Sequence, residues 1–216
     1  MPRPLPVEVV ASTGGDPDAV RDHILDAAYR VIARDGLAAA TTRAVAEEAG
    51  IGAGTLYNYF DDRLQLLARS IFRRVSIVAG PLRDLHAFAG KDTVAANLRQ
   101  FARRAGRILD ELVPLFSAAF SDADLLVALR HEMSSAAAGG PSPGVPIERY
   151  LLAERELGRV SPEADCHAAA SLIVSLCHDR AFHRHFSGAT GRLPPFTREI
   201  DFIARAVAAR EPARTS

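Results

Sequence analysis

A glycine-rich stretch that runs into aromatic residues, EEAGIGAGTLYNYF at residues 47–60, is the first candidate for chemistry in this chain. Its glycines stand at positions 50, 52 and 54, and backbone N–H groups that glycine leaves accessible at the start of a helix bind phosphate well. A dinucleotide-binding loop needs a further glycine where this chain has Thr55, and a nucleotide P-loop needs a Gly-Lys-Ser or Gly-Lys-Thr sequence, which is absent. The spacing therefore argues against a nucleotide site, and we expect no cofactor.

Histidines and cysteines near the C-terminus are a second candidate for chemistry. His178, His183 and His185 are separated by five and two residues, whereas two metal ligands on one helical face are separated by about four. Cys166 and Cys177 are eleven residues apart in a segment with helical periodicity, a separation of about 16 Å along the axis that no disulfide can bridge. We expect no metal site and no disulfide, and the chain order of Ser, His and Asp supports no catalytic triad.

The composition narrows the class of protein. The chain has 216 residues, 48% of them hydrophobic, which is enough for a sizeable core in one large or two small domains. Basic and acidic residues each number 26, so the formal net charge is zero and any contact with DNA must be local. The sequence has no apolar run long enough to span a membrane, and its N-terminus lacks the apolar region of a secretory signal. We therefore expect a cytoplasmic protein.

Helical signals recur along the whole chain, so we expect an all-α fold. Asp16 followed by Pro17 predicts the start of a first helix, and apolar residues at a period of about 3.6 continue it to Gly36. Residues 1–15 contain three prolines and show little periodicity, so we expect them to form a mobile arm.

Two short helices are expected after the first one. Thr41 is suited to cap a helix over residues 42–49, and Gly50 can adopt the left-handed backbone that ends it. A third helix is expected to begin at residue 52 or 53 and to run through residue 59. Two short helices joined by about three residues that include a glycine form a helix-turn-helix.

The third helix carries side chains that could contact a large partner. Gly52 and Gly54 keep its start free of bulk, so that its backbone can approach the partner closely. The hydroxyls of Tyr57 and Tyr59 are suited to phosphate oxygens. Asn58 lies between the two tyrosines, where it could read adenine in the major groove or simply lie on the helix surface. These residue types and this spacing indicate a DNA-binding helix.

The segment ATTRAVAEEAGIGAGTLYNYF, followed by a charged pair and RLQLL, resembles the DNA-binding signature of the tetracycline-repressor (TetR) family of bacterial transcription regulators. The resemblance covers about residues 18–67. It implies a three-helix DNA-binding domain, a larger helical domain that binds a small effector, and a homodimer on palindromic double-stranded DNA. Arg63 takes the position of the family's lysine at the start of the fourth helix, whereas Gly52 and Ala53 stand where the family often has a serine and a polar residue.

The resemblance implies a set of DNA-contacting residues in and beside the helix-turn-helix. These are Thr42, Arg43, Gly52, Ala53, Gly54, Thr55, Tyr57, Asn58, Tyr59 and Arg63. Residues 18–63 include five arginines against eight acidic residues, a net charge of −3 that is unusual for a DNA-binding domain. We therefore expect DNA contact to depend on where the arginines lie and not on the net charge of the domain. Much of the acidic charge is expected on the outer face of the first helix.

Beyond residue 62 the pattern indicates amphipathic helices. The expected helices are 62–79, 93–110, 163–186 and 196–209. Gly80 and Pro81 are expected to break the first of these, and another apolar segment begins after Pro114. The arginines at positions 99, 103 and 107 share one face of the 93–110 helix, and we interpret them as a solvated face in preference to a site for an anionic effector.

Two sets of residues in these helices are candidates for binding. Large side chains on inward stripes are suited to a pocket for a small apolar or aromatic effector, although an ordinary core is the simpler interpretation of each one. The candidate pocket residues are Phe72, Phe101, Phe116, Phe120, Met133 and Phe182. The resemblance implies that the last two helices pair with a second protomer, and small residues on the 163–186 helix would let those helices approach. The candidate interface residues are Ser171, Leu172, Ser175, Ile200, Ile203 and Val207.

These patterns predict an all-α protein in which an N-terminal three-helix domain binds DNA and a larger C-terminal domain binds a ligand and dimerises. The expected segments are an arm at 1–15, a helix-turn-helix domain at 16–62, an effector-binding and dimerisation domain at 63–210 and a tail at 211–216. The expected function is a transcriptional repressor that a small effector releases from its operator, with no enzymatic activity and no membrane partner. The alternative is a helical ligand-binding or enzymatic protein that does not bind DNA.

Overall fold

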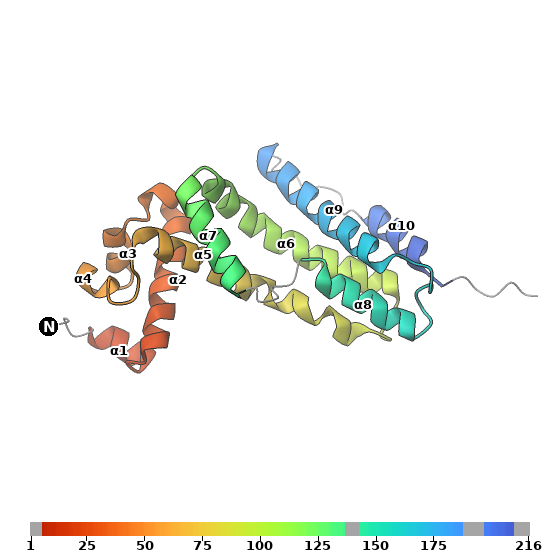
Figure 1. Cartoon of the computed structure of the whole chain (residues 1–216), viewed down its shortest axis with the longest axis horizontal. Coiled ribbons are helices and arrows are strands. Elements are labelled where there is room, and N and C mark those ends of the chain that lie inside the picture. The colour runs from red at the N-terminus through yellow and green to blue at the C-terminus, as the bar shows by residue number, and fades with distance from the viewer. Residues whose placement is uncertain (1–5, 137–142, 188–196, 210–216) are drawn as a thin grey trace, which may run out of the picture. The chain divides into compact units, whose positions relative to one another are not determined.

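A computed structural model describes residues 6–136, 143–187 and 197–209 of the chain. Within these residues the fold is all-α, as the sequence predicts, and β-structure is limited to one isolated bridge between Val160 and Ala208 (Figure 1). The elements in chain order are α1 (Val7–Thr13), α2 (Pro17–Asp35), η1 (Leu37–Ala39), α3 (Thr42–Glu48), α4 (Ala53–Leu56), α5 (Arg63–Ala79), η2 (Gly80–Phe88), α6 (Val94–Phe120), α7 (Ala123–Ala136), α8 (Val145–Glu156), α9 (Cys166–Phe186) and α10 (Thr197–Val207).

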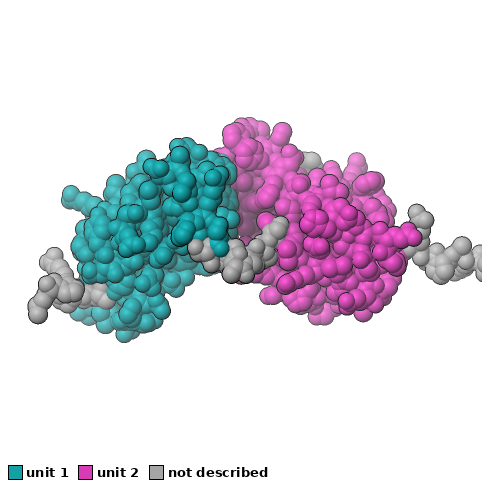
Figure 2. Space-filling model, viewed as in Figure 1, with its two compact units in different colours: residues 1–77, 114–140 teal, residues 78–113, 141–216 magenta. Residues whose placement is uncertain are grey.

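The chain divides into two compact units, which Figure 2 draws in different colours. The first contains residues 1–77 and 114–140, and the second contains residues 78–113 and 141–216. The first unit thus includes most of α5, whereas the domain boundary expected from the sequence precedes that helix. α5 belongs with the N-terminal helices because Ser70 Oγ donates a hydrogen bond to the carbonyl of Leu25 in α2 (2.8 Å).

α2 begins and ends at the residues that the sequence predicts. The carboxylate of Asp16 accepts hydrogen bonds from the N–H groups of Asp18 and Ala19, and Pro17 occupies the first helical position, where its missing N–H has no partner to lose. Gly36 follows the last helical residue with a φ of +84°, a region that favours glycine. The apolar face of α2 is buried through Val20, Ile24, Leu25, Ala27, Ala28, Val31 and Ile32.

The N-terminal segment differs from the mobile arm that its composition suggests. Residues Val7–Thr13 form α1, and the side chain of Val9 is buried where α1 packs on α2. The hydroxyls of Ser12 and Thr13 both donate to the carbonyl of Val9. Tertiary packing of one apolar side chain stabilises a helix that is too short to be stable alone, so the expectation of an arm is wrong for these residues. Residues 1–5 lie outside the described residues.

α4 is shorter than the sequence predicts. It begins at Ala53, one of the two expected starts, but it ends at Leu56 instead of continuing through residue 59. The N–H groups of Asn58 and Tyr59 donate to carbonyls three residues earlier, so residues 57–59 form a tight turn after the helix. The side chains expected to contact DNA therefore lie partly on α4 and partly on this turn.

α6 continues through Pro114, where the sequence predicts a new segment. A proline within a helix removes one backbone hydrogen bond. Pro114 is exposed while its neighbours Val113 and Leu115 are buried, so their burial offsets the lost bond.

Neither α6 nor any other described helix is long and apolar enough to cross a membrane.

A polar cluster is buried within the apolar core of the second unit. Asn97 on α6 donates from Nδ2 to the hydroxyl of Tyr150 on α8 (2.9 Å) and to the carbonyl of Lys91 (2.7 Å). Glu154, one turn after Tyr150, is fully buried, and Nε of Arg159 lies 3.0 Å from its carboxylate. Burial raises the pKa of the Tyr150 phenol, so it remains protonated. These contacts join α6 and α8 to the loops beside them.

α10 packs its apolar stripe into the core of its own unit. Ile200, Ile203 and Val207 are buried there, with Ile200 only 1% exposed. A side chain buried within one protomer cannot contact a second protomer, so assigning these three residues to a dimer interface is wrong. The other expected interface residues are exposed on α9, namely Ser171, Leu172 and Ser175.

Candidate nucleic-acid interface

The start of α3 is held by a cap and by an arginine from α5. Thr41 Oγ1 accepts a hydrogen bond from the N–H of Ala44 (3.1 Å), which is the cap that the sequence predicts. Arg63, the first residue of α5, donates from Nε to the carbonyl of Ala40 (2.9 Å) and from Nη2 to the carbonyl of Leu37 (2.9 Å). Both carbonyls belong to the connection between α2 and α3. Arg63 therefore binds the protein's own backbone.

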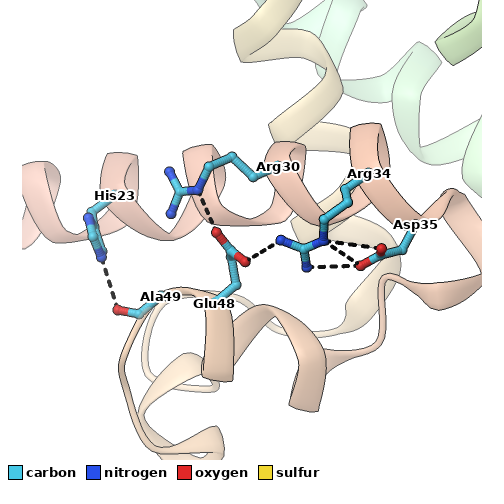
Figure 3. Close-up of polar contacts among 6 residues, drawn as sticks. All are labelled: His23, Arg30, Arg34, Asp35, Glu48 and Ala49. Carbon is cyan, nitrogen blue, oxygen red and sulfur yellow. Dashed lines mark hydrogen bonds and ion pairs between the residues drawn. The ribbon is translucent and has the colours of Figure 1, made fainter.

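The end of α3 is tied to α2 by polar contacts that Figure 3 shows. One carboxylate oxygen of Glu48 lies 2.7 Å from Nε of Arg30, and the other lies 2.8 Å from Nη1 of Arg34. The hydrogen bonds from Arg30 and then Arg34 lower the pKa of Glu48, so the carboxyl is ionised at neutral pH. His23 Nε2 lies 3.0 Å from the carbonyl of Ala49. None of these positioning residues is evident from the sequence, because their partners are 14 to 26 residues away.

The turn between α3 and α4 has the backbone that the glycine stretch predicts. Gly50 has a φ of +67°, in the left-handed region that other residues rarely adopt. Ile51 is buried, and its N–H donates to the carbonyl of Ala46 (2.9 Å), which closes the turn onto α3. A Cβ at Gly54 would meet no other atom within 4 Å. Internal packing therefore does not require glycine at this position, and the start of α4 can accept a partner from outside.

The residues expected to contact DNA differ in exposure. Those that are exposed come from the start of α3, from α4 and from the turn after it: Arg43, Ala53, Gly54, Tyr57 and Asn58. The Tyr57 side chain is the largest of these and is 57% exposed. Thr42, Gly52 and Tyr59 are half-buried. The exposed set supplies one cation, one phenol and one amide beside a stretch of backbone that carries little bulk.

The structure corrects two of the expected contacts. Thr55 is 6% exposed, because it lies on the side of the single-turn α4 that packs on the rest of the first unit. Its side chain therefore cannot reach a base edge. Arg63 is half-buried, and two of its N–H groups donate to backbone carbonyls instead of pointing outward to a phosphate.

The two aspartates before α5 have a structural role that was not expected from the sequence. Asp62 Oδ1 accepts a hydrogen bond from the N–H of Gln65 (2.8 Å) and so caps the helix. Gln65 Oε1 accepts from the N–H of Asp61 (3.0 Å), and Gln65 Nε2 donates to the Asp61 carboxylate (2.8 Å). An aspartate followed three residues later by a glutamine is the signal that could have identified this cap.

Most acidic residues of this region form ion pairs within the first unit. Glu48 pairs with Arg30 and Arg34, so two guanidinium groups offset the charge of its carboxylate. The other paired acids lie on α2. They are Asp18 with Arg21, Asp35 with Arg34, and Asp22 and Asp26 with Arg73 of α5. A count of charges along the sequence therefore overstates the negative potential that DNA would meet near Arg43.

The six residues expected to line one effector pocket have different environments. Phe101 is buried and lines a cavity of about 10 Å³ between η2 and α6, which has room for about one water molecule. Phe120, Met133 and Phe182 are about half exposed or more. Side chains so exposed lie at the surface of their own unit, so the described structure does not support a closed pocket built from these residues. Phe72 and Phe116 are half-buried in the first unit.

An apolar surface remains on α9 and α10 in the second unit. Leu172, Phe182 and Phe186 share one face of α9 with Ser175, and each is at least half exposed. The rings of Phe182 and Phe186 stack with centroids 4.5 Å apart. Phe202 on α10 is 67% exposed. We refer to these four exposed side chains together as the α9–α10 apolar surface.

Comparison with known proteins places the helix-turn-helix in a family. Residues 24–69, which run from within α2 to within α5, match the model of the bacterial regulatory proteins of the tetR family. This chain belongs to the TetR family. The match includes the whole of α3, the Gly50 turn and α4, so the geometry described above is that of a TetR-family helix-turn-helix.

The relatives of this TetR-family chain include a characterised repressor. The HTH-type transcriptional repressor KstR of Mycobacterium tuberculosis is 37% identical over 70 residues, which make up 32% of this chain and 31% of that protein. The chain thus matches about a third of the length of its curated relative.

Solved structures show that the whole TetR-family fold is shared. A Mesorhizobium loti protein assigned to the TetR-family transcriptional regulators covers 88% of this chain and 94% of its own, with a TM-score of 0.69 and 20% identity. The transcriptional regulator FadR of Bacillus subtilis, solved in complex with stearoyl-CoA, covers 88% of this chain and 99% of its own, with a TM-score of 0.58 and 15% identity. At sequence identities of 20% and 15%, these similarities show that the fold is shared.

Proposed function

We propose that this chain is a transcriptional repressor that binds a palindromic double-stranded DNA operator through α3 and α4. The observation that carries the proposal is that hydrogen bonds and ion pairs hold the helix-turn-helix on α2 and α5, and that the first residues of α4 have small side chains. Ala53 and Gly54 let the backbone approach DNA closely, while Arg43, Tyr57 and Asn58 are exposed beside it as donors to phosphates or bases. The TetR-family match and the similarity to a repressor support the same function.

A mobility-shift assay tests this function. The full chain is mixed with duplex fragments from upstream of its own gene and of neighbouring genes, with a coding-region fragment of equal length as the control. Retardation of a promoter fragment at protein concentrations that leave the control unbound supports the proposal. Equal affinity for promoter and control fragments contradicts it. Absence of a retarded band with every fragment favours the alternative, a helical ligand-binding or enzymatic protein whose N-terminal helices only pack. A reporter gene placed behind the retarded fragment should then be expressed less when the chain is present.

Release by a small apolar or aromatic effector is the second part of the proposal. We place effector binding and dimerisation in residues 63–210, beyond the DNA-binding domain at 16–62. An effector shifts the equilibrium between two conformations only if it binds one of them more tightly. The similarly folded FadR of Bacillus subtilis was solved with stearoyl-CoA, which supports an apolar ligand. Fatty acids, acyl-CoA compounds and aromatic compounds titrated into the mobility-shift assay should include one class that removes the retarded band.

We also propose that the protein acts as a homodimer in the cytoplasm. The α9–α10 apolar surface supports the dimer, because a large exposed apolar patch usually marks an interface. Ser171 and Ser175 would let two copies of α9 approach closely. A two-fold dimer would present two copies of α4 to the two half-sites of a palindrome.

A further inference from the structure

Arg63 joins the first residue of α5 to the connection that precedes α3. Its Nε and Nη2 reach the carbonyls of Ala40 and Leu37, which lie 23 and 26 residues earlier in the sequence. A guanidinium is planar and presents its N–H groups in a fixed fork, so two such hydrogen bonds set both the distance and the orientation of the backbone that accepts them. Both hydrogen bonds are formed within the protein itself, without DNA.

We propose, on the basis of the DNA-binding function above, that Arg63 is a positioning residue that holds α3 in the orientation required for operator binding. The end of α3 is fixed to α2 by Glu48 and His23. α2 is in turn fixed to α5 by Ser70 and Arg73. At the start of α3 the Thr41 cap binds the N–H of Ala44 within the helix, whereas Arg63 links the preceding connection to α5.

The position of Arg63 in the family pattern suggests a different role, namely a contact with a DNA phosphate. The two roles predict different salt dependence. A phosphate contact releases condensed counterions, so its loss lowers the slope of log K against log salt by about one unit. A positioning residue lowers affinity by reducing the fraction of molecules in the binding-competent conformation, and the slope stays the same.

The experiment compares Arg63→Met with Arg43→Met, which removes the same group from an exposed position. The DNA is a duplex that the wild-type chain has selected from a random-sequence library. Affinity is measured over a range of salt concentrations, and amide hydrogen exchange is measured on each free protein. For Arg63→Met we expect about tenfold weaker binding, an unchanged salt slope and faster exchange confined to residues 37–48. For Arg43→Met we expect a slope lower by about one unit and wild-type exchange.

Several outcomes would overturn the assignment of Arg63. Wild-type affinity in Arg63→Met would show that the contact does not matter for binding, and a slope lower by about one unit with wild-type exchange would show a phosphate contact. If Arg63→Met does not fold, hydrogen exchange in Arg63→Lys decides. Acceleration confined to residues 37–48 supports positioning, and uniform acceleration across α2, α3 and α5 shows a general role in stability. If the wild-type chain selects no duplex, the proposed function fails, while exchange still reports whether Arg63 holds α3.

Discussion

The Glu48 carboxylate lies 2.7 Å from Nε of Arg30, and this contact bonds the end of α3 to α2. An isolated ion pair at a protein surface contributes little, but Glu48 is shared with Arg34 and is 21% exposed. The orientation of the helix-turn-helix therefore depends on a small charged network outside the DNA-contacting residues.

Glu48→Gln should destabilise the protein in a pH-dependent way. The pKa of Glu48 is lowered in the folded state, so its contribution to stability is full above the ordinary value of 4.5 and is lost as the pH falls through the folded-state pKa. The melting temperature of Glu48→Gln should lie below that of the wild type at neutral pH, and the two should converge as the pH falls below 4.5 and through the folded-state pKa. Circular dichroism across this range measures the difference. A difference that does not shrink at low pH would show that the charge of Glu48 is not its source.

Tyr57→Phe should weaken operator binding without affecting folding. The Tyr57 side chain is 57% exposed, so its hydroxyl is available to a phosphate and is not needed for packing. Loss of one such hydrogen bond costs on the order of 1 kcal/mol, or about fivefold in affinity. Tyr59→Phe should have a smaller effect, because Tyr59 is half-buried. Equal losses of affinity for the two variants, or none for either, would contradict the exposure-based ranking. The melting temperature of each variant serves as the folding control.

Ser175→Arg should dissociate the dimer and abolish specific DNA binding. Ser175 lies on the face of α9 that carries the α9–α10 apolar surface, where a second protomer would bury the new charge without a partner. An uncompensated buried charge costs on the order of 3 kcal/mol. Sedimentation measures the oligomeric state, and Ser134→Arg, an exposed serine on α7, is the matched control. A monomeric wild type, or a monomeric Ser175→Arg with undiminished operator affinity, would reject the proposed interface.

The two cysteines should be slow to react with thiol reagents in the native protein. Burial raises the pKa of the Cys177 thiol to about 12, and burial also raises the pKa of Cys166. The thiolate is the reactive form, so it is scarce at about pH 8 in the folded state. Ellman's reagent should therefore modify both thiols rapidly in denaturant and slowly without it. Rapid modification of one thiol in the native protein would show that its burial is incomplete in solution.

Several features of the fold could be predicted from short stretches of sequence. Asp16 and Pro17 start α2, Thr41 caps α3, and Gly50 adopts the left-handed backbone of the turn. Each depends on residues within about four positions, because caps and turns are made by local hydrogen bonds and by the φ that a residue allows. The resemblance to the TetR family has the same origin, since its signature lies within one continuous segment.

Other features depend on which helices meet. A period of about 3.6 residues shows that Ile200, Ile203 and Val207 share a face, but it does not show whether that face meets the same chain or a second protomer. The charge and length of Arg63 suit a phosphate as well as they suit two carbonyls more than twenty residues earlier. Folding brings those carbonyls to within 2.9 Å of the guanidinium, and this long-range approach, which no local pattern encodes, gives Arg63 its role.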